Sequence, residues 1–149
     1  MIVPIRDQYL EGAKVAHTEL VVLPKEEAEQ LRSQVAERFA RSQVSWLWER
    51  FVDAVAIQDD KSWKWVDDYI AGSETIIFFN KFDDSTIFVL PAGSRLVPIL
   101  RETYLSEFYL TNSRADYLLC YNHHGYLIAT GTAREWLSQR IANMPSQNE

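Results

Sequence analysis

The stretch YLLCYNHHGYLIATG, residues 117–131, predicts two antiparallel strands joined by a tight turn. Apolar and aromatic residues lie on both sides of Asn122 to Gly125, and Asn and Gly tolerate the positive φ that such a turn requires. Directly afterwards, Thr132 and Glu135 have the spacing of a capping box, so we expect a helix to begin there. A hairpin that leads into a helix is typical of an α+β fold.

The rest of the chain fits the same fold class. TIIFFNKF (75–82) and TIFVL (86–90) predict a second hairpin, FYLTN (108–112) an edge strand and ELVVL (19–23) a short strand. Apolar spacing predicts helices over 23–43, over 44–58 with Ser45 as a cap, over 59–74 with Gly72 as the stop, and over 95–108. We therefore predict an antiparallel sheet of four or more strands packed with helices, with a mainly helical N-terminal half.

Composition indicates one ordinary globular domain. A chain of 149 residues with 47% hydrophobic and 24% charged residues can bury about 68–70% of its unfolded surface without a metal or a disulfide. No linker or repeat divides it, so we expect a single domain over 1–149 with a loose tail at 144–149. The net charge of -6 argues against nucleic acid and anionic membranes as partners and favours a basic one.

The sequence also limits where the protein works. The single cysteine cannot form an internal disulfide, and the first residues lack the basic and apolar regions of a leader peptide. No run of about 18 apolar residues predicts a membrane span. We expect a cytoplasmic protein.

The histidine-rich turn raises the question of a metal or catalytic site. Cys120, His123 and His124 are the soft ligands nearby, one fewer than a structural zinc site uses, and neighbouring side chains on a strand point apart. Cys120 lies in an apolar strand, where a thiol is usually inert. No nucleotide-binding, hydrolase or deaminase motif is present. We predict no cofactor, no metal site and no catalytic residue.

Pairs of adjacent aspartates suggest a binding surface instead. Asp59-Asp60 and Asp67-Asp68 flank the tryptophans of SWKW (62–65), and Asp83-Asp84 falls in the second hairpin. On a helix over 59–74, Asp67 and Asp68 lie near the C-terminus, where the dipole disfavours them, and Trp65 turns outward when Trp63 is buried. Three solvated pairs beside core tryptophans is the simpler interpretation. The functional one takes these residues as anchors for a basic partner: Asp59, Asp60, Trp65, Asp67, Asp68, Asp83 and Asp84.

The segments SWLWERF, SWKWVDDYI before TIIFFN, and EFYLTNSRADYLLCYNHHGYLIATGTAREWL resemble bacterial proteins of the SUKH type. The resemblance covers roughly residues 44 to 140 and consists of apolar spacing with a strand-turn-strand-helix ending. It implies an α+β protein without enzymatic activity, an immunity protein that binds and blocks a toxin, often a basic nuclease.

The sequence therefore predicts a binding protein, best described as an immunity protein that neutralises a cognate bacterial toxin. Two alternatives stay open. One is a small enzyme or ligand-binding domain with a pocket lined by Tyr104, Tyr117, Tyr121, His123 and His124. The other is a structural or adaptor protein that forms a homodimer through an exposed strand edge.

Overall fold

A single open sheet organises the molecule. The computed structural model describes residues 3–40 and 51–145. In this part of the chain seven strands pair antiparallel in the order β1-β4-β3-β5-β6-β7-β2. Their bounds are β1 Val21–Val22, β2 Val55–Gln58, β3 Thr75–Phe78, β4 Phe88–Leu90, β5 Phe108–Thr111, β6 Tyr117–Tyr121 and β7 Tyr126–Gly131. The predicted α+β class and the predicted antiparallel sheet are confirmed.

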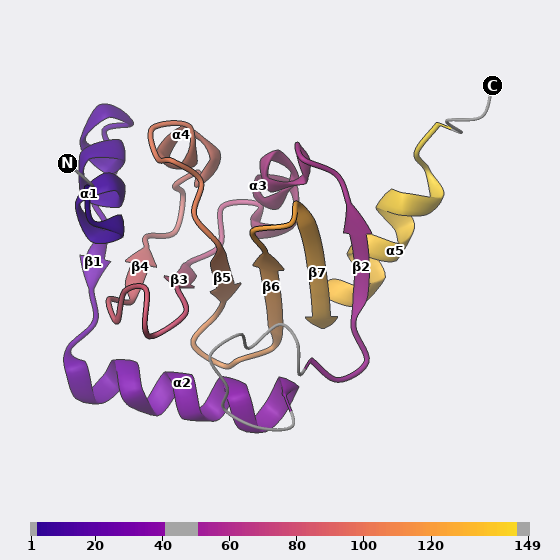
Figure 1. Cartoon of the computed structure of the whole chain (residues 1–149), viewed down its shortest axis with the longest axis horizontal. Coiled ribbons are helices and arrows are strands. Elements are labelled where there is room, and N and C mark those ends of the chain that lie inside the picture. Colours follow the sequence, from indigo (N-terminus) through magenta and orange to yellow (C-terminus); the bar gives the residue numbers. More distant parts are fainter. Residues whose placement is uncertain (1–2, 41–50, 146–149) are drawn as a thin grey trace.

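Helices cover both faces of the sheet, as Figure 1 shows: α1, α3 and α4 lie on one side and α2 on the other, with α5 beside β2. The helices are α1 Ile5–Val15, α2 Lys25–Phe39, α3 Val66–Ile70, α4 Val97–Leu100 and α5 Ala133–Ala142, and the 3-10 helix η2 is Ser62–Trp65. No helix of residues 3–40 and 51–145 is long and apolar enough to cross a membrane.

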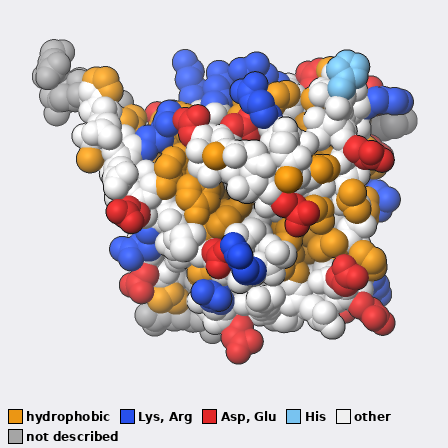
Figure 2. Space-filling model, turned by 180° about the vertical axis from the view of Figure 1, so that it is seen from behind, with side chains coloured by type: hydrophobic (Ala, Val, Ile, Leu, Met, Phe, Trp, Pro, Cys, Tyr) orange, Lys and Arg blue, Asp and Glu red, His pale blue; other side chains and the backbone are white. Residues whose placement is uncertain are grey.

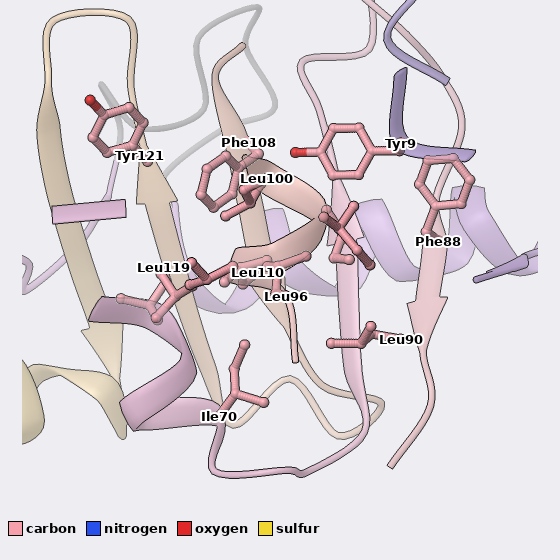
Figure 3. Packing of buried hydrophobic residues seen from close by; sticks show 14 of the residues in the cluster. Tyr9, Ile70, Phe88, Leu90, Leu96, Leu100, Phe108, Leu110, Leu119 and Tyr121 are labelled. Carbon is pink, nitrogen blue, oxygen red and sulfur yellow. The ribbon is translucent and has the colours of Figure 1, made fainter. Parts of the chain in front are cut away.

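Alternating side chains of the central strands build the two halves of the core. Leu110 and Leu119 join the cluster under α1, α3, α4 and α5, part of which Figure 3 shows. Their neighbours Tyr109 and Leu118 point the other way and pack with apolar residues of α2. Because both faces are covered, β3, β5 and β6 are buried along their whole length, which explains their continuous apolar sequences.

The prediction of a helix over 44–58 is wrong for its last residues, which form β2. Residues 41–50, with the proposed cap Ser45, lie outside the described part of the chain. Asp53 has a positive φ of 53°, and Val55 to Gln58 then pair with β7. Burial alternates along β2, with Val55 and Ile57 half-buried and the other two residues exposed. The sequence VAIQ therefore follows the strand period of two rather than the helical period.

Two further predictions around β5 need correction. The expected helix over 95–108 is only the four residues of α4; turns follow it, and Leu105, with a positive φ of 57°, has a conformation outside any helix. The expected edge strand FYLTN is β5, which lies between β3 and β6 in the centre of the sheet. Its residues Phe108 to Thr111 are all buried.

The sequence analysis missed α1, which packs closely against α4. A Cβ on Gly12 would come within 2.8 Å of the carbonyl oxygen of Ile99, so glycine permits this approach. Glycine in a helix interior is unfavourable by about 1 kcal/mol, and the tertiary contact outweighs it. The contact between helices, which no local pattern shows, explains the residue.

The last helix, α5, begins where predicted but without the predicted capping box. Thr132 has helical dihedral angles and makes no side-chain cap hydrogen bond. Its hydroxyl instead pairs with the Tyr69 hydroxyl at 2.8 Å. The threonine thus ties α3 to the start of α5. The expected loose tail begins at Met144, and its residues 146–149 lie outside the described part.

Candidate functional site

Strand register brings several predicted site residues to one end of the sheet. Phe78 pairs with Tyr109, Phe108 with Tyr121, and Gln58 with Tyr126. The loops that follow β3, β6 and β2 therefore lie at the same end as the start of β5. We call this region the acidic end. Its predicted members are Asp59, Asp60, Asp83, Asp84, His123 and His124.

Two of the four aspartates at the acidic end accept hydrogen bonds from backbone N–H groups, and a third, Asp83, accepts one from Asn80 Nδ2 at 3.5 Å. The carboxylate of Asp59 accepts a hydrogen bond from the backbone N–H of Lys61 at 2.8 Å. The two carboxylate oxygens of Asp84 accept from the backbone N–H groups of Arg6 and Thr86, at 3.0 Å and 2.9 Å. Both aspartates are half-buried, and they hold their loops in shape. They add negative charge to the surface, but their carboxylate oxygens already accept hydrogen bonds within the chain.

The other two aspartates, Asp60 and Asp83, are exposed. Asp60 lies against the histidine turn, because a Cβ on Gly125 would meet its Oδ1 at 2.5 Å, and its carbonyl accepts a hydrogen bond from the Tyr121 hydroxyl at 3.1 Å. Burial, followed by the charges of Asp60 and Asp59, raises the pKa of Tyr121. Tyr121 therefore stays a neutral donor beneath the acidic end.

A buried carboxylate lies under the histidine turn, and the sequence analysis missed it. The side chain of Glu107 is only 4% exposed, and its Oε1 accepts from the backbone N–H of His123 at 3.0 Å and contacts His123 Nδ1 at 2.9 Å. Asn80 donates from Nδ2 to the second oxygen of Glu107 and accepts at Oδ1 from the Tyr109 hydroxyl at 2.8 Å. This network joins the ends of β3, β5 and β6.

The network fixes the histidine turn. Its hairpin is confirmed: Asn122 donates to the carbonyl of Tyr126 at 3.0 Å, and Gly125 has a φ of 77°. The rings of His123 and His124 lie 3.9 Å apart between centroids, and the side chain of His123 is 47% exposed. A carboxylate on one ring nitrogen orients an imidazole, the arrangement that a general base or a hydrogen-bonding surface residue requires.

Cys120 lies in the same region without the character of a nucleophile. Its side chain is fully buried, and burial, with a smaller effect from the Glu107 charge, raises its pKa well above the usual value. The thiolate form that reacts or binds metal is therefore disfavoured. Among the described residues no group of three or more histidine, cysteine, aspartate or glutamate side chains is placed to hold a metal ion.

The remaining acidic pair, Asp67 and Asp68, lies away from the acidic end on α3. The expectation that the helix dipole disfavours them is wrong, because both lie in the first turn of α3. Asp67 accepts hydrogen bonds from the backbone N–H groups of Leu96 and Val97 at 2.7 Å and 3.0 Å, so it ties α3 to the start of α4. Asp68 is exposed and pairs with Arg140 at 2.8 Å.

Trp65 is not the outward-facing anchor that helical spacing predicted. It is half-buried, packs against the core, and has the guanidinium of Arg140 4.4 Å from its ring centroid. Segment 59–74 forms η2 and then α3 rather than one helix, so the spacing argument used the wrong period. The helix does end as predicted, with Ala71 and Gly72 at positive φ.

The residues of the alternative pocket do not meet in one place. Tyr104 is 78% exposed and lines a shallow pocket with Trp63 and Leu100. Tyr117 and Tyr121 are at opposite ends of β6, and Tyr117 lines a different pocket beside Tyr69. Only Tyr121, His123 and His124 share the acidic end.

A family model matches residues 7–143, nearly the whole described chain. The chain belongs to DUF6756, a family of unknown function. No curated protein and no solved structure matches the sequence or the fold.

Proposed function

We propose that the chain is a non-enzymatic binding protein of the cytoplasm, an immunity protein that neutralises a cognate bacterial toxin by direct binding. The observation that carries the proposal is that two acidic segments distant in sequence, 59–60 and 83–84, follow β2 and β3 at the same end of the sheet, with β5, β6 and β7 between these strands. The carboxylates in these loops are able to pair with lysine or arginine of a basic toxin domain, and opposite charge speeds encounter between partners.

Two exposed aromatic side chains support the same proposal. Phe82, in the loop with Asp83, is 57% exposed, and Tyr126, beside the histidine turn, is 37% exposed. Aromatic side chains are enriched at the centres of protein interfaces because they bury a large area at low entropic cost. Figure 2 shows Lys and Arg side chains gathered along the upper edge of the face seen there, and Asp and Glu side chains scattered over the rest of it among apolar ones. The proposed surface is therefore defined by the loops at one end of the sheet, and not by a face that carries only negative charge.

The test begins with the protein that the gene next to this one encodes. If that protein is a toxin, co-expression of this chain should restore colony formation to cells that produce it. Association of the purified pair is then measured at low and high salt for the Asp60→Lys/Asp83→Lys variant. We expect at least a tenfold slower association and a weaker salt dependence.

The matched control is Glu74→Lys. Glu74 is exposed and precedes β3, so it lies at the opposite end of the sheet. Glu74→Lys changes the net charge half as much as the double variant does. Its association rate should lie within twofold of the rate expected from this change in net charge alone. Equal losses per charge in both variants, or no protection of the cells, would refute the proposal.

The Glu107–His123 contact is the one observation that favours the alternative, a small enzyme or ligand-binding domain. A buried carboxylate that orients a half-exposed imidazole is a common catalytic arrangement. His123→Ala separates the two functions. Because His123 lies in the proposed binding surface, association of the purified pair is measured beside protection of the cells: protection that survives supports the binding protein, and protection lost while association is retained transfers the support to the alternative.

A further inference from the structure

The sheet has an open edge at β2. Asp59 donates its backbone N–H to the carbonyl of Gly125 at 2.9 Å, so these two residues form a hydrogen-bonded pair of the β2–β7 ladder. Hydrogen-bonded and non-hydrogen-bonded pairs alternate along an antiparallel ladder. Ile57 and Val55 therefore also form hydrogen-bonded pairs with β7. The N–H and C=O groups of Ala56 and Gln58 therefore point away from the sheet.

These outward groups are accessible. Ala56 and Gln58 are exposed, and no hydrogen bond within the described residues uses their outward backbone groups. The opposite edge of the sheet is β1, which has only two residues. Natural proteins usually protect a strand edge with charge, proline or a covering element. VAIQ contains neither a charge nor a proline, and α5 covers β2 on one face of the sheet only.

Charge is present at both ends of β2 instead. Asp53 precedes the strand, Asp59 and Asp60 follow it, and Lys61 comes directly after them. Two copies of this chain paired through β2 would bring six of these carboxylates close together, which disfavours a homodimer. An extended segment with lysine or arginine on each side of an apolar centre would instead be attracted to these carboxylates.

The two faces of the edge also differ. The side chains of Val55 and Ile57 pack against the core cluster on the side of α5, and Figure 1 shows α5 running past the edge that β2 forms. A strand added to β2 would place alternate side chains against this overhanging helix, near Trp136 and Ile141, which are half-buried. Its other side chains would lie beside exposed Ala56 and Gln58.

We propose that β2 accepts an extended segment of a basic protein partner as an eighth strand of the sheet. The segment has about four alternating residues with an apolar side chain toward α5, and lysine or arginine at both ends. Main-chain hydrogen bonds to Ala56 and Gln58 supply the affinity, and the flanking aspartates select the charge. The inference depends on the proposed function only for the basic character of the partner.

A synthetic peptide provides the test. The probe is Lys-Lys-Thr-Val-Thr-Val-Lys-Lys with blocked ends, and the matched peptide replaces each Lys with Glu. Binding is followed by NMR amide shifts of the full chain. We expect the largest shifts at Ala56 and Gln58, slower amide exchange there, and binding at least tenfold weaker for the Glu peptide.

Two changes isolate the backbone contacts. N-methylation of the peptide amides that face β2 should abolish binding without any change in the protein. Ala56→Pro removes one outward N–H and spares the ladder to β7, so it should weaken the Lys peptide at least tenfold. Equal binding of both peptides, survival of binding after N-methylation, or shifts centred elsewhere would overturn the inference.

The remaining outcomes are also decisive. A dimer mass in sedimentation without peptide, lost in Ala56→Pro, would show that a second copy occupies the edge and would overturn the inference. Toxin binding that survives Ala56→Pro but not Asp60→Lys/Asp83→Lys would leave the proposed function standing and refute the role of β2. Peptide binding at β2 with no effect on any toxin would support the role of β2 and refute the proposed function.

Discussion

The hydroxyl of Tyr9 allows a sharp test of the core. Tyr9 is 1% exposed, and its hydroxyl makes no hydrogen bond within the described chain. Figure 3 shows its oxygen directed into the apolar cluster towards Phe108 and Leu100. Its ring packs edge-on against Phe79 at 5.0 Å and stacks on Phe88 at 5.7 Å between centroids. The ring is well packed, whereas the hydroxyl has lost water without gaining a partner.

Tyr9→Phe should therefore stabilise the protein. Burying a polar group without a partner costs about 1–3 kcal/mol, and the small void left by the oxygen costs up to about 1 kcal/mol. The expected net gain in the free energy of unfolding is about 1 kcal/mol. For a chain of this size that corresponds to a rise in Tm of about 2–4 °C.

Tyr109→Phe is the matched control, because the same hydroxyl is removed from a buried ring that has a partner. Tyr109 donates to Asn80 Oδ1 at 2.8 Å and stacks on Phe78 at 5.0 Å. Its loss leaves a buried acceptor with one donor fewer, so we expect destabilisation by about 1–3 kcal/mol. Urea unfolding followed by tryptophan fluorescence measures both variants, and an unchanged m-value licenses the comparison. A destabilised Tyr9→Phe variant with unchanged m would refute the reasoning.

Three further predictions concern other parts of the fold. Asp67→Ala should lower the free energy of unfolding by about 2 kcal/mol in urea, because two backbone N–H groups of α4 lose their acceptor, while Asp68→Ala, which breaks an exposed ion pair, should cost roughly 0–1 kcal/mol; equal effects would contradict this. Gly131→Ala should cost about 2 kcal/mol or more by thermal unfolding, since its φ is 67° and a Cβ would lie 2.5 Å from the Asp116 carbonyl oxygen. Burial raises the pKa of Cys120 and Tyr117, so the fold favours their protonated forms; this stabilisation is complete below their unfolded values of about 9 and 10 and is lost as the pH rises above them. Urea midpoints from pH 8 to 11 should therefore fall, and a flat profile would show that these groups are not buried as described.

The elements that the sequence predicts correctly depend on local interactions, and those that it does not predict depend on contacts between residues distant in sequence. The hairpin at Asn122 to Gly125 was predictable because turn residues and alternating strands are local signals. β2 was not, because VAIQ becomes a strand only by pairing with β7, about 70 residues further on. Local pattern could not distinguish a short apolar strand from the end of a buried helix.

The candidate site shows the same division. Composition and aspartate pairs indicated acidic anchors, and the register places Asp59, Asp60, Asp83 and Asp84 at the same end of the sheet. Asp67 carries the same sequence signal but caps α4, since its role depends on a contact between α3 and α4. Glu107 was missed because one carboxylate before an apolar strand looks like a surface residue. A polar residue flanked by buried strands, repeated at Asn80 after TIIFF, was the available signal.

The place of β2 in the sheet has a consequence for synthesis of the chain. Residues 55–58 leave the ribosome well before their partner strand at 126–131 exists. At about 5–20 residues per second, the 70 residues between them take roughly 4–14 s to make. During that time the strand lacks β7, its one neighbour in the described sheet, and Asp53, Asp59 and Asp60 repel the same residues of other nascent copies. Charge beside an unpaired strand disfavours pairing with another copy, so we expect these acids to limit aggregation before β7 is made.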